Sequence, residues 1–162
     1  MQFSSDTNIW IDFQTIDALA LPFRLNHSFY ISVDAVNDEL LTPAGINEAL
    51  LSLGLIPLEV SGAEYFVAYE MMATYPRLSR YDALALMVAK ERGFILLTGD
   101  KALREAGTIE GVTVKGTLWI FDELKHEGRI SSDEYHDYMV ALNAHNGKEI
   151  RLPAAEIRKR ME

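Results

Sequence analysis

The chain has 162 residues, of which 49% are hydrophobic and 24% charged, so it can bury the core of one domain and is too apolar to be disordered. Its net charge of −9 excludes proteins that coat nucleic acid through overall positive charge. Cysteine is absent, which excludes disulfides, zinc–thiolate centres and cysteine nucleophiles. The first residues show no secretory signal, and the longest helical apolar stretch, 83–89, is far shorter than the roughly 20 residues that span a bilayer. We therefore expect a cytoplasmic protein with no membrane segment.

Strand patterns alternate with helix patterns along the chain. The predicted strands are 2–5, 28–32, 55–60, 94–97 and 112–114. Residues 6–8 are of types that start helices, and a mixed apolar segment follows them. The predicted helices are 33–43, 44–53, 62–75, 79–92, 100–106, 117–127, 131–143 and 153–161. This alternation predicts an α/β fold, a three-layer α/β/α sandwich around a mostly parallel central sheet.

Local signals place several boundaries. Pro43 cannot continue a helix, and Gly54 and Gly93 stand where helices commonly end. There is no internal repeat or flexible linker. Residues 148–162 hold five basic and three acidic residues, a net charge of +2 that leaves −11 for the rest. We expect one domain over 1–147 and a basic C-terminal extension, 148–162, packed on it.

Four carboxylates fall near the predicted carboxyl edge of the sheet. They are Asp6 after the first strand, Glu39 within the helix 33–43, Asp82 in the first turn of the helix 79–92, and Asp100 after the strand 94–97. Because the carboxyl ends of parallel strands share one edge, we expect these side chains to converge. Closely packed carboxylates repel one another, and a hard divalent cation such as Mg²⁺ or Mn²⁺ relieves that repulsion. Such a site serves phosphodiester cleavage.

Each acid also has a structural alternative. Asp6 and Asp100 stand at helix starts, where a carboxylate caps backbone N–H groups for about 1 kcal/mol. Ser79 with Asp82 fits a capping box, and Glu39, placed in mid-helix, is equally well explained as a surface residue. Ser, Thr or Asn would cap as well as an acid does. Four acids together therefore favour a metal site.

Several stretches resemble the PIN domain family, which includes the VapC-type toxins of toxin–antitoxin pairs. They are SDTNIWIDF, VNDELL, LSRYDALALMVAKERGFILLTGDKALR and, for a PIN subgroup, GVTVKGTLWIFDELKHEGRI. The resemblance covers about residues 3–130. It implies a PIN-like fold and a hydrolase that cleaves single-stranded RNA with Mg²⁺ or Mn²⁺. It also implies a homodimer, and a cognate antitoxin as inhibitor.

The resemblance assigns site residues by position. The acids that match the family's catalytic, metal-binding residues are Asp6, Glu39, Asp82 and Asp100. Asn8 matches a supporting polar residue, and Thr98 matches a hydroxyl residue that holds Asp100 by a hydrogen bond. Many members carry a further acid two or three residues after the last aspartate, where this chain has Ala102 and Leu103. This departure predicts one firmly held metal ion and weak activity.

Other residues receive weaker interpretations. The candidates for contacts with RNA phosphates, against the alternative of solvated helix charges, are Arg80, Lys101 and Arg104. The aromatic residues expected to be exposed and available for dimer formation include Trp10, Phe13, Tyr65 and Phe66. The histidines show no ligand spacing, and we expect most of them at the surface: His27, His126, His136 and His145. Asp122 is predicted to be a solvated surface residue.

Three functions therefore stay open at the level of sequence. The first is a ribonuclease toxin. The second is a catalytically weak or inactive PIN-like module that binds RNA or protein, motivated by the missing acid after Asp100 and by the net charge of −9. The third is a different phosphohydrolase with an acidic site, which would turn over small phosphate esters.

Overall fold

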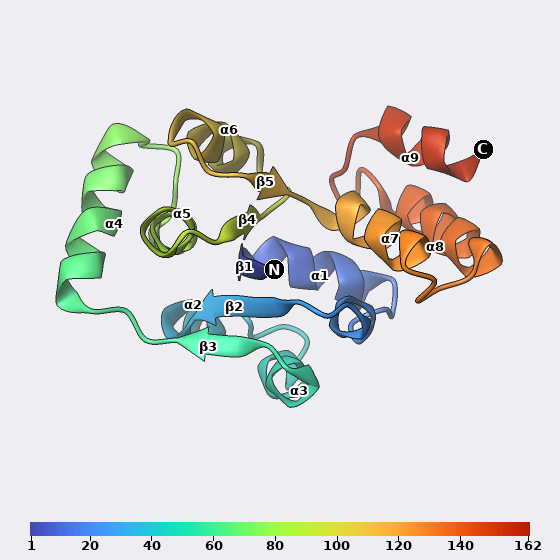
Figure 1. Cartoon of the computed structure of the whole chain (residues 1–162), viewed down its shortest axis with the longest axis horizontal. Helices are drawn as coiled ribbons and strands as arrows, with labels where there is room; N and C mark the ends of the chain where they lie inside the picture. The colour runs from blue at the N-terminus through green and yellow to red at the C-terminus, as the bar shows by residue number, and fades with distance from the viewer.

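A five-stranded parallel sheet forms the centre of the computed structural model, which describes all residues 1–162 (Figure 1). The strands are β1 Gln2–Ser5, β2 Ser28–Ser32, β3 Ile56–Leu58, β4 Ile95–Leu97 and β5 Val114–Lys115. Their order is β3-β2-β1-β4-β5, and every neighbouring pair is parallel. All five predicted strands are present, although β3 and β5 are shorter than their patterns predicted.

Nine α-helices and one 3₁₀ helix surround the sheet. They are α1 Thr7–Thr15, η1 Leu21–Arg24, α2 Val33–Asp38, α3 Ile46–Leu53, α4 Gly62–Thr74, α5 Arg80–Arg92, α6 Lys101–Ile109, α7 Thr117–His126, α8 Ser132–His145 and α9 Ala154–Met161. Capping boxes begin α4, α5 and α8, at Ser61, Ser79 and Ser131. No helix is both long and apolar enough to cross a membrane.

Helices cover both faces of the sheet, and each face has its own core. On one face, Leu96 of β4 packs with buried residues of α4, α5 and α6. On the other, Phe3 of β1, Phe29 of β2 and Leu97 of β4 pack with α1, α7 and α8. Figure 1 shows α4 and the group α7–α9 at opposite ends of the molecule. The predicted three-layer α/β/α sandwich is confirmed.

A hydrogen bond ties the central helix to the central strand. The hydroxyl of Ser4 in β1 donates to the backbone carbonyl of Ala85 in α5 over 2.8 Å, and both residues are buried. Residues 83–89 of α5 are buried without exception, as its broad apolar face predicted. Gly93 ends α5 with φ 69°, a conformation that glycine adopts without strain. The residues that begin α5 are therefore fixed relative to the end of β1.

The helix predicted over 33–43 is wrong in its second half. It ends at Asp38, and Glu39 is the C-cap residue instead of a mid-helix residue. The backbone N–H of Leu40 bonds to the carbonyl of Ala35, one residue further back than in a helix, and Leu40 becomes fully buried. Burial of Leu40 therefore ends the helix before Pro43 does.

Two other expectations about the surface were wrong. Trp10 and Phe13, expected among exposed aromatic residues, have no exposed surface, because α1 packs them into the larger core. Asp122 is not a free surface acid. It accepts hydrogen bonds from Arg160 of α9 and from the hydroxyl of Tyr135 of α8. The ion pair with Arg160 joins α7 to α9, and the hydrogen bond from Tyr135 joins α7 to α8.

Candidate active site

Asp6 lies at the carboxyl end of β1, opposite the residue that follows β4. The register pairs Ser5 with Leu97, and the hydroxyl of Thr98 donates to the Asp6 carboxylate over 2.9 Å. Asp6 is the N-cap residue of α1, yet its side chain makes no capping hydrogen bond. Only 5% of the residue is exposed. Helix capping therefore does not explain this buried acid.

Thr98 connects two of the predicted acids. Its hydroxyl donates to Asp6 and accepts a hydrogen bond from the backbone N–H of Asp100 over 3.1 Å. The side chain of Thr98 is fully buried, so both bonds are shielded from water. The sequence predicted a bond to Asp100, which is present through the backbone. The bond to Asp6 is an additional contact.

Glu39 approaches the same edge of the sheet from the end of α2. The hydroxyl of Thr7, the residue after Asp6, donates to the Glu39 carboxylate over 2.8 Å. A cavity of about 10 Å³ is lined by Asp6, Thr7 and Glu39 and by apolar residues of β2, α2 and α5, but not by Asp82 or Asp100. This is about the room that one water molecule needs.

Asp82 and Asp100 do cap helices, as their structural alternative predicted. The carboxylate of Asp82 accepts from the backbone N–H of Ser79 over 2.9 Å, at the start of α5. The carboxylate of Asp100 accepts from the backbone N–H of Leu103 over 2.9 Å, at the start of α6. An ionised carboxylate has about four lone-pair positions, so one capping bond leaves acceptor capacity. Capping and metal binding are compatible at both residues.

The four carboxylates lie near enough to repel one another. Burial, followed by the charges of Asp82, Glu39 and Asp100, raises the pKa of Asp6 to about 7, against the lowering effect of the bond from Thr98. Burial also raises the pKa of Glu39, and the charge of Asp82 adds to it. The pKa of Asp82 is raised by burial and by the charge of Asp100. The structure therefore brings Asp6, Glu39, Asp82 and Asp100 into one interacting group, called here the acidic pocket.

The donors of the acidic pocket fit a hard divalent cation. All of them are carboxylate oxygens, which Mg²⁺ and Mn²⁺ prefer, and the buried Asp6 carboxylate has a single hydrogen bond. A cation among the four would relieve the repulsion that raises the pKa of Asp6. No three of the four carboxylates have ligand atoms that all lie within 4.8 Å of one another, as His27, Glu123 and Glu127 do elsewhere. The acidic pocket therefore matches a divalent cation in its ligand chemistry, and its side chains would have to move closer together to bind one jointly.

Asp12 is a fifth carboxylate beside this site that the sequence analysis missed. It lies one turn after Asn8 on α1, and the buried hydroxyl of Thr117 donates to it over 2.8 Å. Burial raises the pKa of Asp12 to about 6, against the lowering effect of Thr117. Asn8, Asp12 and Asp100 line a cleft of about 500 Å³, called here the Asp12 cleft. Asp12 could have been found from the sequence, because it lies four residues after Asn8 and this spacing places Asn8 and Asp12 on one face of a helix.

Basic side chains border the Asp12 cleft. Lys101 of α6 and Arg151, which precedes α9, line it directly. Arg104 lines two neighbouring hollows, one with Lys101 and one with Arg151. Arg80 is instead engaged with Asp34, with Nη2 and Oδ2 2.6 Å apart. Of the three predicted phosphate-binding residues, Lys101 and Arg104 therefore lie beside the site, and the sequence analysis did not single out Arg151.

Comparison with known proteins gave one match. The sequence model of a family described as a PIN domain matches residues 2–162, which is nearly the whole chain. No curated protein and no solved structure matched.

Proposed function

This chain belongs to the PIN domain family, whose fold is of nuclease type, and from that premise we propose that it is a metal-dependent endoribonuclease. Its substrate is single-stranded RNA, and it acts in the cytoplasm as the toxin of a type II toxin–antitoxin pair. The observation that supports this function most is the buried Asp6 carboxylate. It caps no helix, accepts one hydrogen bond, and is repelled by three further carboxylates.

We assign the metal-binding role to the acidic pocket, with Mg²⁺ or Mn²⁺ as the cation. A divalent ion there supplies Lewis-acid stabilisation of phosphodiester charge and activation of water. The hydroxyls of Thr98 and Thr7 hold the carboxylates of Asp6 and Glu39 in place by hydrogen bonds. Asn8 faces the Asp12 cleft, where its side-chain amide can donate to a phosphate oxygen.

Positive charge beside the pocket suits the backbone of a single RNA strand. Lys101 and Arg151 line the Asp12 cleft, and Arg104 lies next to each of them. Contacts of this kind position a nucleic acid without reading its sequence. They also explain how a chain with net charge −9 can bind RNA, because the basic side chains gather where the substrate would lie.

The decisive experiment is RNA cleavage with and without Mn²⁺ by the wild type and by Asp100→Asn. Asparagine caps a helix about as well as aspartate, so the variant keeps α6 while losing one negative charge of the pocket. We expect cleavage that requires Mn²⁺ and falls by about 100-fold or more in the variant, since metal-site stabilisation is worth several kcal/mol. Asp133→Asn, in the exposed first turn of α8, is the matched control and should cleave like the wild type. Equal cleavage by wild type and Asp100→Asn would contradict the proposal.

The toxin role is tested separately in cells. Overexpression of the wild type should arrest growth and degrade cellular RNA, and Asp6→Asn should do neither. Co-expression of a small cognate antitoxin should restore growth. If wild type and Asp6→Asn leave growth and RNA equally untouched, the toxin role is wrong.

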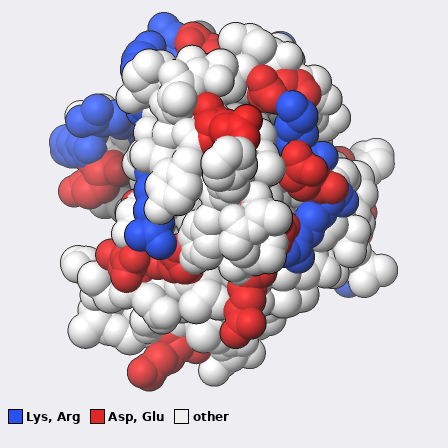
Figure 2. Space-filling view, turned by 90° about the vertical axis from the view of Figure 1, so that its left-hand side faces the viewer, with Lys and Arg blue, Asp and Glu red and all other residues white.

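We place homodimer formation on α4, at one end of the molecule. Phe66 and Tyr69 of this helix are 65% and 56% exposed, whereas Trp10 and Phe13 are buried and Tyr65 is half-buried. Figure 2 shows this end of the molecule, where uncharged surface extends between acidic and basic side chains. Phe66→Ser should shift a dimer toward monomer in analytical ultracentrifugation without changing the acidic pocket.

A binding module that does not cut RNA is the alternative function. The residues after Asp100 favour it, because Ala102 carries no ligand atom and Leu103 is fully buried in the core of α5 and α6. Calorimetry separates the two functions. Mn²⁺ binding that is lost in Asp82→Asn and Asp100→Asn supports the nuclease, and no such binding supports the module.

A further inference from the structure

A second group of potential metal ligands lies at the opposite edge of the sheet from the acidic pocket. His27 immediately precedes β2, Glu123 lies in the last part of α7, and Glu127 is the C-cap residue of α7. The ligand atoms of these three side chains all lie within 4.8 Å of one another. Asp6, in contrast, follows the carboxyl end of β1. The two groups therefore share no residue and lie at different edges.

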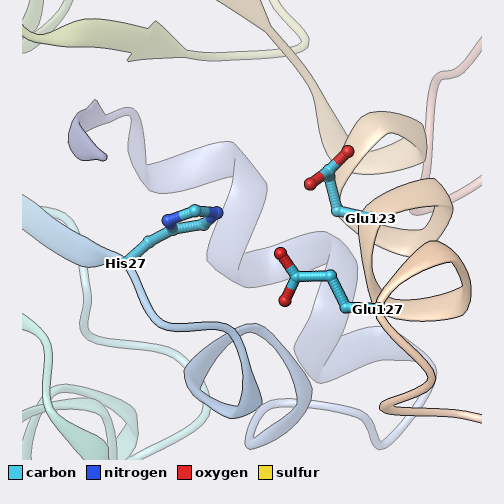
Figure 3. Close-up of side chains that lie close together, drawn as sticks. All are labelled: His27, Glu123 and Glu127. Carbon is cyan, nitrogen blue, oxygen red and sulfur yellow. The ribbon is translucent and has the colours of Figure 1, made fainter.

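The imidazole of His27 is held in a fixed orientation. Its ring packs against Phe3, with centroids 5.4 Å apart, and stacks on Trp119, with centroids 6.1 Å apart and planes inclined by 26°. Its Nδ1 atom lies 3.1 Å from the amino nitrogen of Met1. The Nε2 atom is buried and has no hydrogen-bond partner. Figure 3 shows the ring turned so that one nitrogen points toward Glu123 and Glu127.

An unpartnered buried nitrogen is unusual, because leaving a buried polar atom without a partner costs roughly 1–3 kcal/mol. The two glutamates are four residues apart on α7, and like charges at this spacing repel. Glu127 forms an ion pair with Arg129, whose Nε lies 4.0 Å from the Glu127 carboxylate, the longest ion-pair distance in the structure. Burial and the neighbouring amino terminus lower the pKa of His27, against the raising effect of Glu127 and Glu123, and the net lowering favours the neutral imidazole that binds metals.

We propose that His27, Glu123 and Glu127 form a second divalent-cation site, suited to a borderline ion such as Zn²⁺. One imidazole nitrogen and two carboxylates are ligands that Zn²⁺ accepts, with water completing its coordination. Because an imidazole that binds a metal through Nε2 carries its proton on Nδ1, metal binding would replace the hydrogen bond that Nδ1 accepts from the Met1 ammonium. The site links the start of β2 to the end of α7, so its role is structural.

The chemistry of the two sites makes them separable. Mg²⁺ prefers oxygen ligands and suits the acidic pocket, whereas a mixed nitrogen and oxygen set favours Zn²⁺. Zn²⁺ titrated by calorimetry into the full chain in excess Mg²⁺ should bind one high-affinity equivalent. The double variant Asp6→Asn/Asp100→Asn, which disables the acidic pocket, should bind that equivalent unchanged.

Ligand variants assign the site. His27→Gln should weaken Zn²⁺ binding by about tenfold or more and abolish the rise in melting temperature that Zn²⁺ causes. Glu123→Gln, an exchange on a helix surface that preserves helix propensity, provides the same test if His27→Gln does not fold. His126→Gln, in the same turn of α7 but outside the group, is the matched control and should behave as the wild type.

Three results would overturn the proposal. The proposal fails if Zn²⁺ binding survives both His27→Gln and Glu123→Gln at full affinity, or if the wild type does not bind Zn²⁺. It would also fail if His145→Gln removed the binding, because His145 and Glu149 form a separate pair 3.0 Å apart in α8 and the following turn. Loss of RNA cleavage in acidic-pocket variants leaves the second site untouched, so the two proposals fail independently.

Discussion

The two edges of the sheet both gather carboxylates, but in different surroundings. At the carboxyl edge, Asp6 and its three neighbours are held by hydroxyls and backbone N–H groups, and every potential ligand is an oxygen. At the amino edge, two glutamates face an imidazole that aromatic rings hold in place. Oxygen-only and mixed sets select different cations. If both proposals hold, one sheet separates a catalytic site from a structural site without a second domain.

Removing the charge of Asp6 should have the largest effect on stability. The folded pKa of about 7 lies above the usual 3.8, so the metal-free native state binds more protons than the unfolded state between these values. Stability is therefore lost as the pH rises through this window, by on the order of 4 kcal/mol at most. Asp6→Asn has no carboxylate at this position, so its stability does not fall in this way. Above about pH 7 it should be more stable than the metal-free wild type.

Urea unfolding in EDTA, from about pH 4 to pH 8, measures this effect for wild type and Asp6→Asn. The gap between the two should open with rising pH, and added Mn²⁺ should stabilise the wild type alone. A wild type that shows no extra loss over this window would mean that the carboxylates do not interact as described.

Thr98→Val tests the hydrogen bonds that hold Asp6 and Asp100 in place, and it should have the next largest effect on stability. The change removes the donor to Asp6 and the acceptor of the Asp100 N–H at nearly constant volume, costing about 1–3 kcal/mol of unfolding free energy. We expect Mn²⁺ affinity in calorimetry to fall by about tenfold. Thr117→Val is the matched control, since it removes an equally buried hydroxyl that bonds Asp12. It should lose stability and keep Mn²⁺ affinity closer to wild type.

Ser79→Ala, compared with a second capping variant, distinguishes the effect of helix capping on stability from its effect on RNA cleavage. Loss of the N-cap of α5 should cost about 1 kcal/mol and release the backbone contacts that orient Asp82. Ser61→Ala removes the same kind of capping box from α4, away from the acidic pocket. Both variants should melt lower by similar amounts, and only Ser79→Ala should cleave RNA more slowly. Equal cleavage by the two would show that Asp82 needs no orientation by its cap.

The smallest effect concerns the amino edge. Without Zn²⁺, Glu123→Gln should raise the free energy of unfolding by about 0.3 kcal/mol, because it removes one of two like charges four residues apart. With Zn²⁺ the sign should reverse, since the variant has lost a ligand. Thermal melts with and without the metal measure both. A variant that is stabilised equally in the two conditions would contradict the second site.

Local patterns in the sequence were sufficient for most of the fold. The five strands follow from short apolar segments, and a parallel sheet then brings the residues after its strands to one edge. This reasoning placed Asp6 and Asp100 at the same edge, because the carboxyl ends of parallel strands lie together. The hydrogen bond between Thr98 and Asp6 was not predicted. Glu39 was located at the correct edge but in the wrong conformation. Its helix ends when Leu40 turns into the core, which is a tertiary effect.

Contacts between distant parts of the chain were not predictable in this way. Asp12 accepts a hydrogen bond from Thr117, which lies 105 residues later in the chain. His27 lies close to Glu123 because α7 packs beside η1. Trp10 and Phe13 look similar in sequence to exposed aromatic residues, yet α1 buries both. Asp122 finds Arg160 through the packing of α9 on α8. In each case three-dimensional packing determines which residues are in contact, and spacing along the chain does not reveal it.

The bond from the Ser4 hydroxyl to the Ala85 carbonyl has a mechanical consequence. It couples β1, which Asp6 follows, to α5, whose first turn holds Asp82, so we expect these two acids to move together. Glu39, at the end of a helix of six residues, is joined to that unit through the side chain of Thr7. We therefore expect amide hydrogen exchange to be faster at Glu39 than at Asp6 and Asp82.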